Sequence, residues 1–190
     1  MHRICVFAGA NPGKRDSYTA AAQTLGAEIA RRGHGMVYGG ASRGLMGVCA
    51  DAALAGGAEV VGVLPRALAG REIAHRGLTE LRIVSSLHER KAVMSALSDA
   101  VVALPGGCGT LDELFEAITW SQLGLHEKPI GLFDVDGYYA PLFGVLDQMT
   151  AEGFVHPRLQ LVRATTAGQL LDRLISAPSA AHGSGPAPQP

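Results

Sequence analysis

Three glycines lie within four residues of one another in the segment ALPGGCGTLDELFEAITW, which runs from Ala103 to Trp120 between an apolar run and a helical pattern. Glycine lets the backbone approach a ligand closely, and the first amides of a helix have no partner inside it. These amides and the helix dipole favour an anion, and phosphate is the commonest anion held in this way. The segment therefore predicts a phosphate cradle at Gly106, Gly107 and Gly109.

Acidic side chains follow the glycines in the first turns of a helix predicted over Leu111 to Leu123. Thr110 and Glu113 match the capping box Thr-x-x-Glu, in which two side chains bind the first amides of a helix. Glu116 projects from nearly the same face as Glu113 and is a further candidate contact of the ligand, whereas we expect Asp112 to be solvated. Carboxylates repel a phosphate, but they suit glycosidic cleavage, in which the sugar becomes oxocarbenium-like. Glu113 is therefore a helix cap, a catalytic carboxylate or both.

A basic cluster begins another predicted helix, within SLHERKAVM from Ser86 to Met94. Arg90 offers a planar fork that suits phosphate or carboxylate. Basic residues in the first turns of a helix oppose its dipole, which indicates that Arg90 and Lys91 face a ligand; the alternative is a solvated basic face. Because the histidines show no HxxxH or HExxH spacing, we expect no metal site.

Strands and helices alternate along the chain, as judged from apolar spacing and turn residues. This alternation predicts an α/β fold, a Rossmann-like doubly wound parallel sheet of about seven strands with helices on both faces. The predicted strands are 3–8, 35–40, 58–65, 79–86, 99–105, 128–134 and 159–164, and the predicted helices are 16–32, 43–57, 87–97, 111–123, 138–152 and 167–175.

Glycine-rich loops follow three of the predicted strands, at the edge where open α/β sheets bind ligands. They read GANPG, GGASRG and PGGCGT. We expect Gly9, Gly39 and Gly40 to add phosphate or base contacts, although any one loop could be only a tight turn. Neither GxGxxG after the first strand nor GxxxxGK[ST] occurs, which disfavours an ordinary dinucleotide fold and a P-loop NTPase.

The composition fits one domain, residues 1–176, followed by a tail rich in Pro, Ala, Ser and Gly, residues 177–190, that we expect to be disordered. The net charge is −1. The sequence lacks a basic stripe interleaved with aromatic residues, so we expect no nucleic-acid partner. We identify neither a signal peptide nor a membrane span, so we expect a cytoplasmic protein without a membrane partner. The three cysteines lack CxxC spacing; we expect Cys5 and Cys49 in the core and Cys108 more exposed.

Several of these stretches resemble one family. PGGCGTLDE fits the PGGxGTxxE motif, and YGGASRGLMG is similar to the GGGxxGLMG motif, of the LOG ("Lonely guy") family of cytokinin-activating phosphoribohydrolases. REIAHRGLTEL, LHERKAVM, ITWSQLGLHEKPIGLFDVDGYY and EGFV also resemble it in order, so the match covers roughly Ile4 to Val155. Members were often labelled lysine decarboxylases, but no pyridoxal-phosphate lysine motif supports that label.

The resemblance implies a homodimer that hydrolyses the N-glycosidic bond of a nucleoside 5′-monophosphate, giving free base and ribose 5-phosphate without a cofactor. Arg90 and Glu113 match the family's catalytic arginine and glutamate. The preferred base, plain or N6-modified adenine, stays open. The substrate contacts implied by the resemblance, besides Arg90, are Glu72, Lys91, Gly107, Cys108, Gly109, Thr110, Leu111, Asp112, Glu113 and Thr119.

Two rival hypotheses keep the fold but not the reaction. A sensor or carrier could bind a nucleotide without turning it over, and Glu113 would then be only a cap. A nucleic-acid-binding relative of the fold is disfavoured by the lack of a basic stripe. For the dimer, the stretch ITWSQLGL presents Ile118, Leu123 and Leu125 beside Trp120, which fits either an interface or plain core packing.

Overall fold

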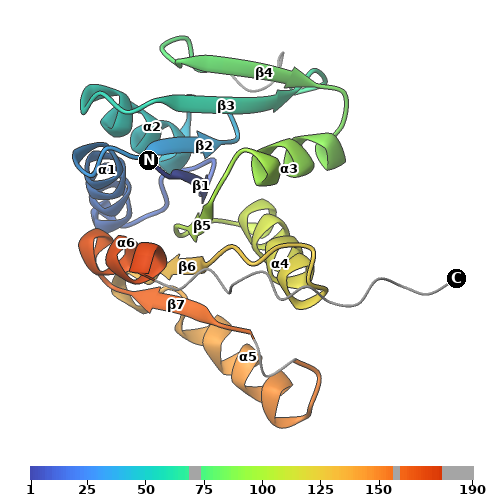
Figure 1. Cartoon of the computed structure of the whole chain (residues 1–190). Helices are drawn as coiled ribbons and strands as arrows, with labels where there is room; N and C mark the ends of the chain where they lie inside the picture. The colour runs from blue at the N-terminus through green and yellow to red at the C-terminus, as the bar shows by residue number, and fades with distance from the viewer. Residues whose placement is uncertain (69–73, 156–158, 177–190) are drawn as a thin grey trace, which may run out of the picture.

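A computed structural model describes residues 1–68, 74–155 and 159–176. Its strands form one parallel sheet of seven in the order β4-β3-β2-β1-β5-β6-β7, which confirms the predicted α/β class (Figure 1). In chain order the elements are β1 (Arg3–Phe7), α1 (Asp16–Arg31), β2 (Gly35–Tyr38), α2 (Gly44–Ala55), β3 (Val60–Pro65), β4 (Glu80–Val84), α3 (Leu87–Ala96), β5 (Ala100–Ala103), α4 (Cys108–Gln122), β6 (Ile130–Phe133), the 3₁₀ turn η1 (Val135–Gly137), α5 (Ala140–Ala151), β7 (Leu161–Ala164) and α6 (Ala167–Ser176).

The sheet is covered on both faces, so its central strands are apolar throughout. Ile4 and Val6 of β1 join a core formed with α1, α2 and α6. Cys5 and Phe7, the alternate residues of the same strand, join a second core formed with α3, α4 and α5. Figure 1 shows these two helical layers on either side of the sheet. Cys5 and Cys49 are buried and Cys108 is exposed, as predicted.

The order of the strands reverses between β1 and β5. β1 pairs with β2 on one side and with β5 on the other, so the chain leaves these two central strands in opposite directions. The loops that follow β1 and β5 therefore separate at the carboxyl edge, where open α/β sheets form a crevice for ligands. The glycine segments GANPG and PGGCGT lie at this point.

Helix α4 begins three residues earlier than predicted. It starts at Cys108, its N-cap is Gly107, and no side chain of the described residues caps it. Thr110 is buried within the first turn, and a Cβ on Gly106 would lie 2.1 Å from its Oγ1. The predicted capping box of Thr110 and Glu113 is therefore wrong, because tertiary packing draws Thr110 into the helix and away from the cap.

Helix α5 begins at Ala140, two residues later than predicted, because η1 reverses the chain first. Asp136 in this turn has a φ of 51°, which few side chains adopt. Glu72 and the tail 177–190 lie outside the described residues, so their assignments stay predictions. Within the described ranges, no helix is both long enough and apolar enough to span a membrane.

Candidate active site

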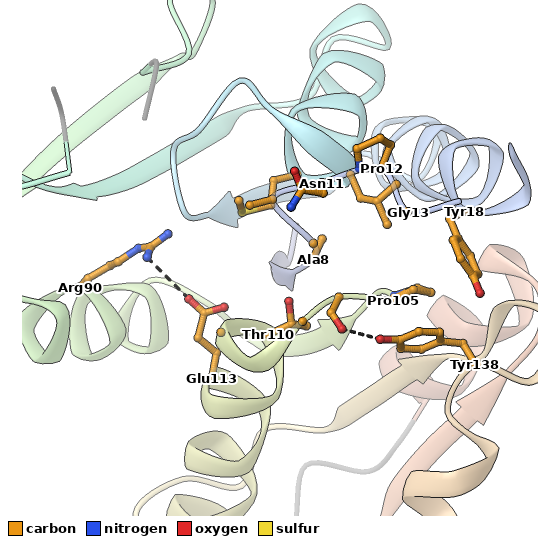
Figure 2. A pocket seen from close by; sticks show the side chains of 17 residues that line it. Ala8, Asn11, Pro12, Gly13, Tyr18, Arg90, Pro105, Thr110, Glu113 and Tyr138 are labelled. Atoms are coloured by element: carbon orange, nitrogen blue, oxygen red, sulfur yellow. Dashed lines mark hydrogen bonds and ion pairs between the residues drawn. The ribbon is translucent and has the colours of Figure 1, made fainter. Parts of the chain in front are cut away.

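A pocket of about 370 Å³ opens at the carboxyl edge of the sheet, beside the ends of β1 and β5. This volume falls within the usual range for small-molecule sites, about 300–1,000 Å³. Figure 2 shows Arg90 and Glu113 at one end of the pocket and Tyr18 and Tyr138 at the other. The pocket is lined by Ala8, Gly9, Ala10, Asn11, Pro12, Gly13, Tyr18, Leu45, Met46, Arg90, Pro105, Gly106, Gly107, Gly109, Thr110, Glu113 and Tyr138.

Main-chain contacts join the loops that form the floor of the pocket. The amide of Gly9 donates to the carbonyl of Pro105 at 3.0 Å, and the amide of Leu45 donates to the carbonyl of Gly9 at 2.9 Å. A Cβ on Gly106 would also lie only 2.9 Å from the Gly9 nitrogen. The loops after β1 and β5 therefore pack backbone against backbone, so Gly106 is required by the fold itself.

Gly107 and Gly109 differ from Gly106 in what surrounds them. A Cβ built on either would meet no atom of the described chain within 4 Å, and neither has a positive φ. Nothing in the packing or the backbone conformation requires glycine at these two positions. Both line the pocket, so the absent side chains leave room for a ligand to approach the main chain.

Three helices begin near this pocket, and no side chain of the described residues caps any of them. Their N-caps are Arg15 for α1, Arg43 for α2 and Gly107 for α4. Arginine is not a residue that normally caps a helix. The dipoles of these helices, together with the amides in the first turn of α4, make this edge of the sheet attractive to an anion.

Arg90 is buried, with 8% of its surface exposed, and two main-chain carbonyls hold its side chain, one within β3 and one directly after β2. Nε donates to the Val63 carbonyl and Nη2 to the Gly39 carbonyl, each at 3.1 Å. A Cβ on Gly39 would lie 2.0 Å from Nη2, so the guanidinium occupies the space of a missing side chain. The third nitrogen, Nη1, lies 3.9 Å from Oε1 of Glu113 (Figure 2).

Glu113 projects into the pocket from the second turn of α4, with 14% of its side chain exposed. Burial raises its pKa to about 7, while Arg90 and Lys91 act to lower the pKa. The carboxyl therefore exchanges its proton near neutral pH, which suits a group that takes or gives a proton during a reaction. Arg90 and Glu113, predicted from separate segments, meet at one end of the pocket.

Lys91 lies beside Glu113 but outside the main pocket. Its Nζ is 2.8 Å from Asp112 Oδ2 and 3.4 Å from Glu116 Oε2. Asp112 is exposed, as predicted, yet it is paired and not simply solvated. Lys91, Glu113 and Glu116 line a second cavity of about 20 Å³, which has room for one water molecule.

The structure brings some of the predicted substrate contacts into the pocket and leaves others outside its lining. Arg90 and Glu113 line it together with the glycine segment. The carbonyl of Gly39 accepts a hydrogen bond from Arg90. The hydroxyl of Thr119 donates a hydrogen bond to the Phe115 carbonyl within α4. Their roles as substrate contacts stay predictions, as do those of the other residues outside this lining, Gly40, Lys91, Cys108, Leu111, Asp112 and Glu116.

The two tyrosines at the far end of the pocket, Tyr18 and Tyr138, were not among the predicted site residues. Tyr138 follows β6, and the rule that ligands bind at carboxyl ends of strands applies to that strand too. The turn signal DG before Tyr138 was visible in the sequence. That its side chain reaches the glycine segment was not visible, because the two segments are far apart in the chain.

Comparisons with known proteins point to the same family as the sequence motifs. A family profile described as "Possible lysine decarboxylase" matches residues 46–174. A probable cytokinin riboside 5′-monophosphate phosphoribohydrolase of Oryza sativa subsp. japonica is 52% identical over 174 residues, covering 90% of this chain and 78% of the relative. A cytokinin riboside 5′-monophosphate phosphoribohydrolase of Arabidopsis thaliana is 48% identical over 176 residues, covering 92% and 82%.

Similar solved structures extend the comparison at the level of the fold alone. A molybdenum cofactor binding protein from Rippkaea orientalis has a TM-score of 0.69 at 20% identity and covers 92% of this chain and 96% of its own. A molybdenum cofactor carrier protein from Chlamydomonas reinhardtii has a TM-score of 0.67 at 23% identity, covering 92% and 96%. From the sequence identity to the curated relatives, the chain belongs to the LOG family, that of the cytokinin riboside 5′-monophosphate phosphoribohydrolases.

Proposed function

We propose that the protein hydrolyses the N-glycosidic bond of an adenosine 5′-monophosphate, plain or modified at N6, to free base and ribose 5-phosphate. The observation that carries this proposal is one pocket that combines open helix amides with a buried carboxyl. The relatives, about half identical in sequence, carry the name of this activity. A nucleoside monophosphate has the matching parts, an anionic end and a sugar carbon that becomes cationic.

The 5′-phosphate binds at the start of α4. The amides of Cys108, Gly109 and Thr110 occupy the first turn of this uncapped helix, where amides have no partner inside the helix. Gly107 and Gly109 leave their backbone uncovered. The phosphate thus takes the place of a helix cap, and the helix dipole adds to its binding.

Glu113 directs the attack on C1′ of the ribose. Water adds to C1′ as the bond from C1′ to the base nitrogen breaks, and that bond's electron pair leaves with the base. Ionised Glu113 stabilises the cationic sugar and accepts the proton of the attacking water. Its placement one turn after the phosphate-binding amides holds sugar and carboxylate in a fixed relation.

Arg90 anchors the substrate beside this carboxylate. Two of its nitrogens donate to main-chain carbonyls, so the guanidinium is fixed before any ligand arrives. Nη1, on the side of Glu113, steadies the negative charge that develops on the departing base. A preorganised cation of this kind costs no reorganisation during the reaction.

The test is to incubate the protein with nucleoside monophosphates, nucleosides and lysine and to identify the products by mass. We expect adenine from AMP, N6-isopentenyladenine from its riboside monophosphate, ribose 5-phosphate from both, and no decarboxylation of lysine. Glu113→Gln should lower kcat by about 10²–10⁴ while circular dichroism shows an intact fold. Tight AMP binding without ribose 5-phosphate over hours would instead favour the sensor or carrier.

We also propose that the protein is a homodimer that pairs through the carboxyl end of α4. Leu123 and Leu125 are each 68% exposed there, whereas Ile118 is buried in the monomer core and cannot contribute. Large exposed apolar residues in one segment mark an interaction surface. Analytical ultracentrifugation should show a dimer at micromolar concentration, and Leu125→Asp should shift it to monomer; a wild-type monomer would contradict the proposal.

A further inference from the structure

The turn between β6 and α5 reaches the pocket at the end opposite to Arg90 and Glu113 (Figure 2). Tyr138 lies on this turn, and its hydroxyl donates a 2.5 Å hydrogen bond to the Gly106 carbonyl. The bond links the turn to the glycine segment before α4. The reaction described above gives this tyrosine no part, so the contact calls for a separate explanation.

The contact fixes which way the peptide between Gly106 and Gly107 faces. The carbonyl and the amide of a trans peptide point in opposite directions, and none of the described residues has a cis peptide. With the Gly106 carbonyl turned toward Tyr138, the amide of Gly107, a residue that lines the pocket, faces the opposite way, away from the tyrosine. A flipped peptide would present a carbonyl oxygen there, which repels phosphate.

This peptide needs a lock because both of its residues are glycine. Without a Cβ on either side, the backbone has access to more conformations than at any other residue pair. Gly106 is confined by Thr110 and Gly9, but a Cβ on Gly107 would meet nothing within 4 Å in the described chain. The side chain of Tyr138 supplies a restraint that local sterics do not.

Tyr138 is itself held firmly enough to act as a restraint. Its ring packs edge-on against Tyr18 and Tyr139, with centroids 5.7 and 5.0 Å apart. Asp136, in the same turn, accepts a 2.6 Å hydrogen bond from the Ser17 hydroxyl of α1. The carboxylate of buried Asp134 accepts a 2.7 Å hydrogen bond from the Tyr139 amide. The turn is therefore tied down on both sides of Tyr138.

We propose that Tyr138 is a positioning residue of the phosphate cradle: its hydroxyl holds the Gly106 carbonyl so that the Gly107 amide is presented to the 5′-phosphate. The proposal rests on the nucleotide substrate proposed above. The phosphate is bound in both the ground state and the transition state, so losing this restraint weakens binding without slowing the chemical step.

Tyr139, the next residue in the chain, offers a matched control for Tyr138. Its hydroxyl donates to the Leu104 carbonyl at 2.6 Å, two residues before Gly106. It is 1% exposed and is not part of the pocket lining. The variants Tyr138→Phe and Tyr139→Phe thus each remove one hydroxyl that binds a carbonyl of the same segment, but only one of these hydroxyls belongs to the pocket.

The experiment measures KM and kcat for AMP, the inhibition constant of inorganic phosphate and the midpoint of thermal unfolding for both variants. Tyr138→Phe should raise KM and the phosphate inhibition constant by the same factor, about five- to tenfold, with kcat within about twofold of wild type. Tyr139→Phe should lower the unfolding midpoint and leave both constants for phosphate-bearing ligands unchanged.

Three results would overturn the proposal: unchanged KM and phosphate inhibition in Tyr138→Phe, a fall in kcat alone, or equal increases in both variants. If wild type proved inactive, the hydrolase proposal would fail, yet calorimetric titration with AMP and with inorganic phosphate would still decide the role of Tyr138. Equal phosphate affinity in folded wild type and folded Tyr138→Phe would then count against the positioning role.

Discussion

Two helices of this protein begin with the same pattern, a hydroxyl residue followed three positions later by glutamate, and only one uses it as a cap. At α3, the Ser86 hydroxyl accepts the Glu89 amide at 3.1 Å. The Glu89 carboxylate in turn accepts a 2.7 Å hydrogen bond from the Ser85 amide and a second hydrogen bond from the Ser85 hydroxyl. At α4, the helix begins before Thr110, and its N-cap Gly107 offers no side chain.

The two glutamates differ in their proton affinity as a result. Hydrogen bonds from the Ser85 side chain and backbone lower the pKa of Glu89, whereas burial raises the pKa of Glu113 to about 7. A helix whose amides are satisfied by its own residues serves as a support, and α3 in this way carries Arg90. A helix whose amides stay open is left to bind something else.

The side chain that α3 carries should have a large effect on turnover. Arg90→Lys should lower kcat by about 10²–10³, because a single ammonium cannot bind the Val63 and Gly39 carbonyls and also face the substrate. Steady-state kinetics on AMP measures the loss, with circular dichroism as the control for folding. Near wild-type turnover by the lysine variant would show that the guanidinium geometry is unimportant.

Ionisation of Glu113 should cost the protein stability as the pH rises. Its folded pKa of about 7 lies above the ordinary value of 4.5, so its contribution is fully present below pH 4.5 and is lost as the pH rises through 7. Glu113→Gln cannot ionise, so the variant should gain up to about 3 kcal/mol relative to wild type between pH 5 and pH 8. Urea unfolding at each pH measures this difference.

Glu89→Gln provides the control for that pH series. Because the folded pKa of Glu89 is lowered, its contribution is present above its ordinary pKa and is lost as the pH falls through the folded value. The variant should therefore be less stable than wild type at neutral pH, with the difference shrinking in acid. A constant difference at every pH for Glu113→Gln would refute the raised pKa.

Filling the open start of α4 should separate binding from stability. Gly109→Ala should stabilise the helix by about 0.5–1 kcal/mol, because glycine is a poor helix former and the added Cβ meets no protein atom. The same methyl group should weaken binding of AMP about tenfold by crowding the phosphate, a loss of about 1.4 kcal/mol. Calorimetric titration measures the affinity and thermal unfolding measures the stability. Unchanged affinity for AMP would show that the phosphate does not bind beside Gly109.

Removing the cap of α3 should have the smallest and purely structural effect. Ser86→Ala should lower the free energy of unfolding by about 1 kcal/mol, since the Glu89 amide loses its acceptor. Affinity for inorganic phosphate should stay that of wild type, because this helix end binds its own side chains. A large loss of phosphate affinity in this variant would contradict the division between the two helices.

Much of the fold was predictable from local pattern. Apolar runs on both faces of the central strands and turn residues between them predict a covered parallel sheet, and the seven strands appear in that arrangement. The PGGCGT segment, Arg90 and Glu113 could be singled out because residue type alone restricts what they can do. The start of α4 was less predictable, because glycine disfavours helix, and yet the helix begins at Cys108 and includes Gly109.

The sequence by itself determined the order of elements, the glycines and the charged residues that the pocket contains. Only the tertiary structure decided which Ser/Thr-x-x-Glu motif forms a cap, that Gly39 makes space for Arg90, and that Tyr138 reaches Gly106. The contact of Arg90 with Gly39 joins residues 51 positions apart, and that of Tyr138 with Gly106 joins residues 32 positions apart. Helical and strand periodicity reports only neighbours within a few residues, so it cannot specify contacts that form when the sheet brings distant loops to one edge.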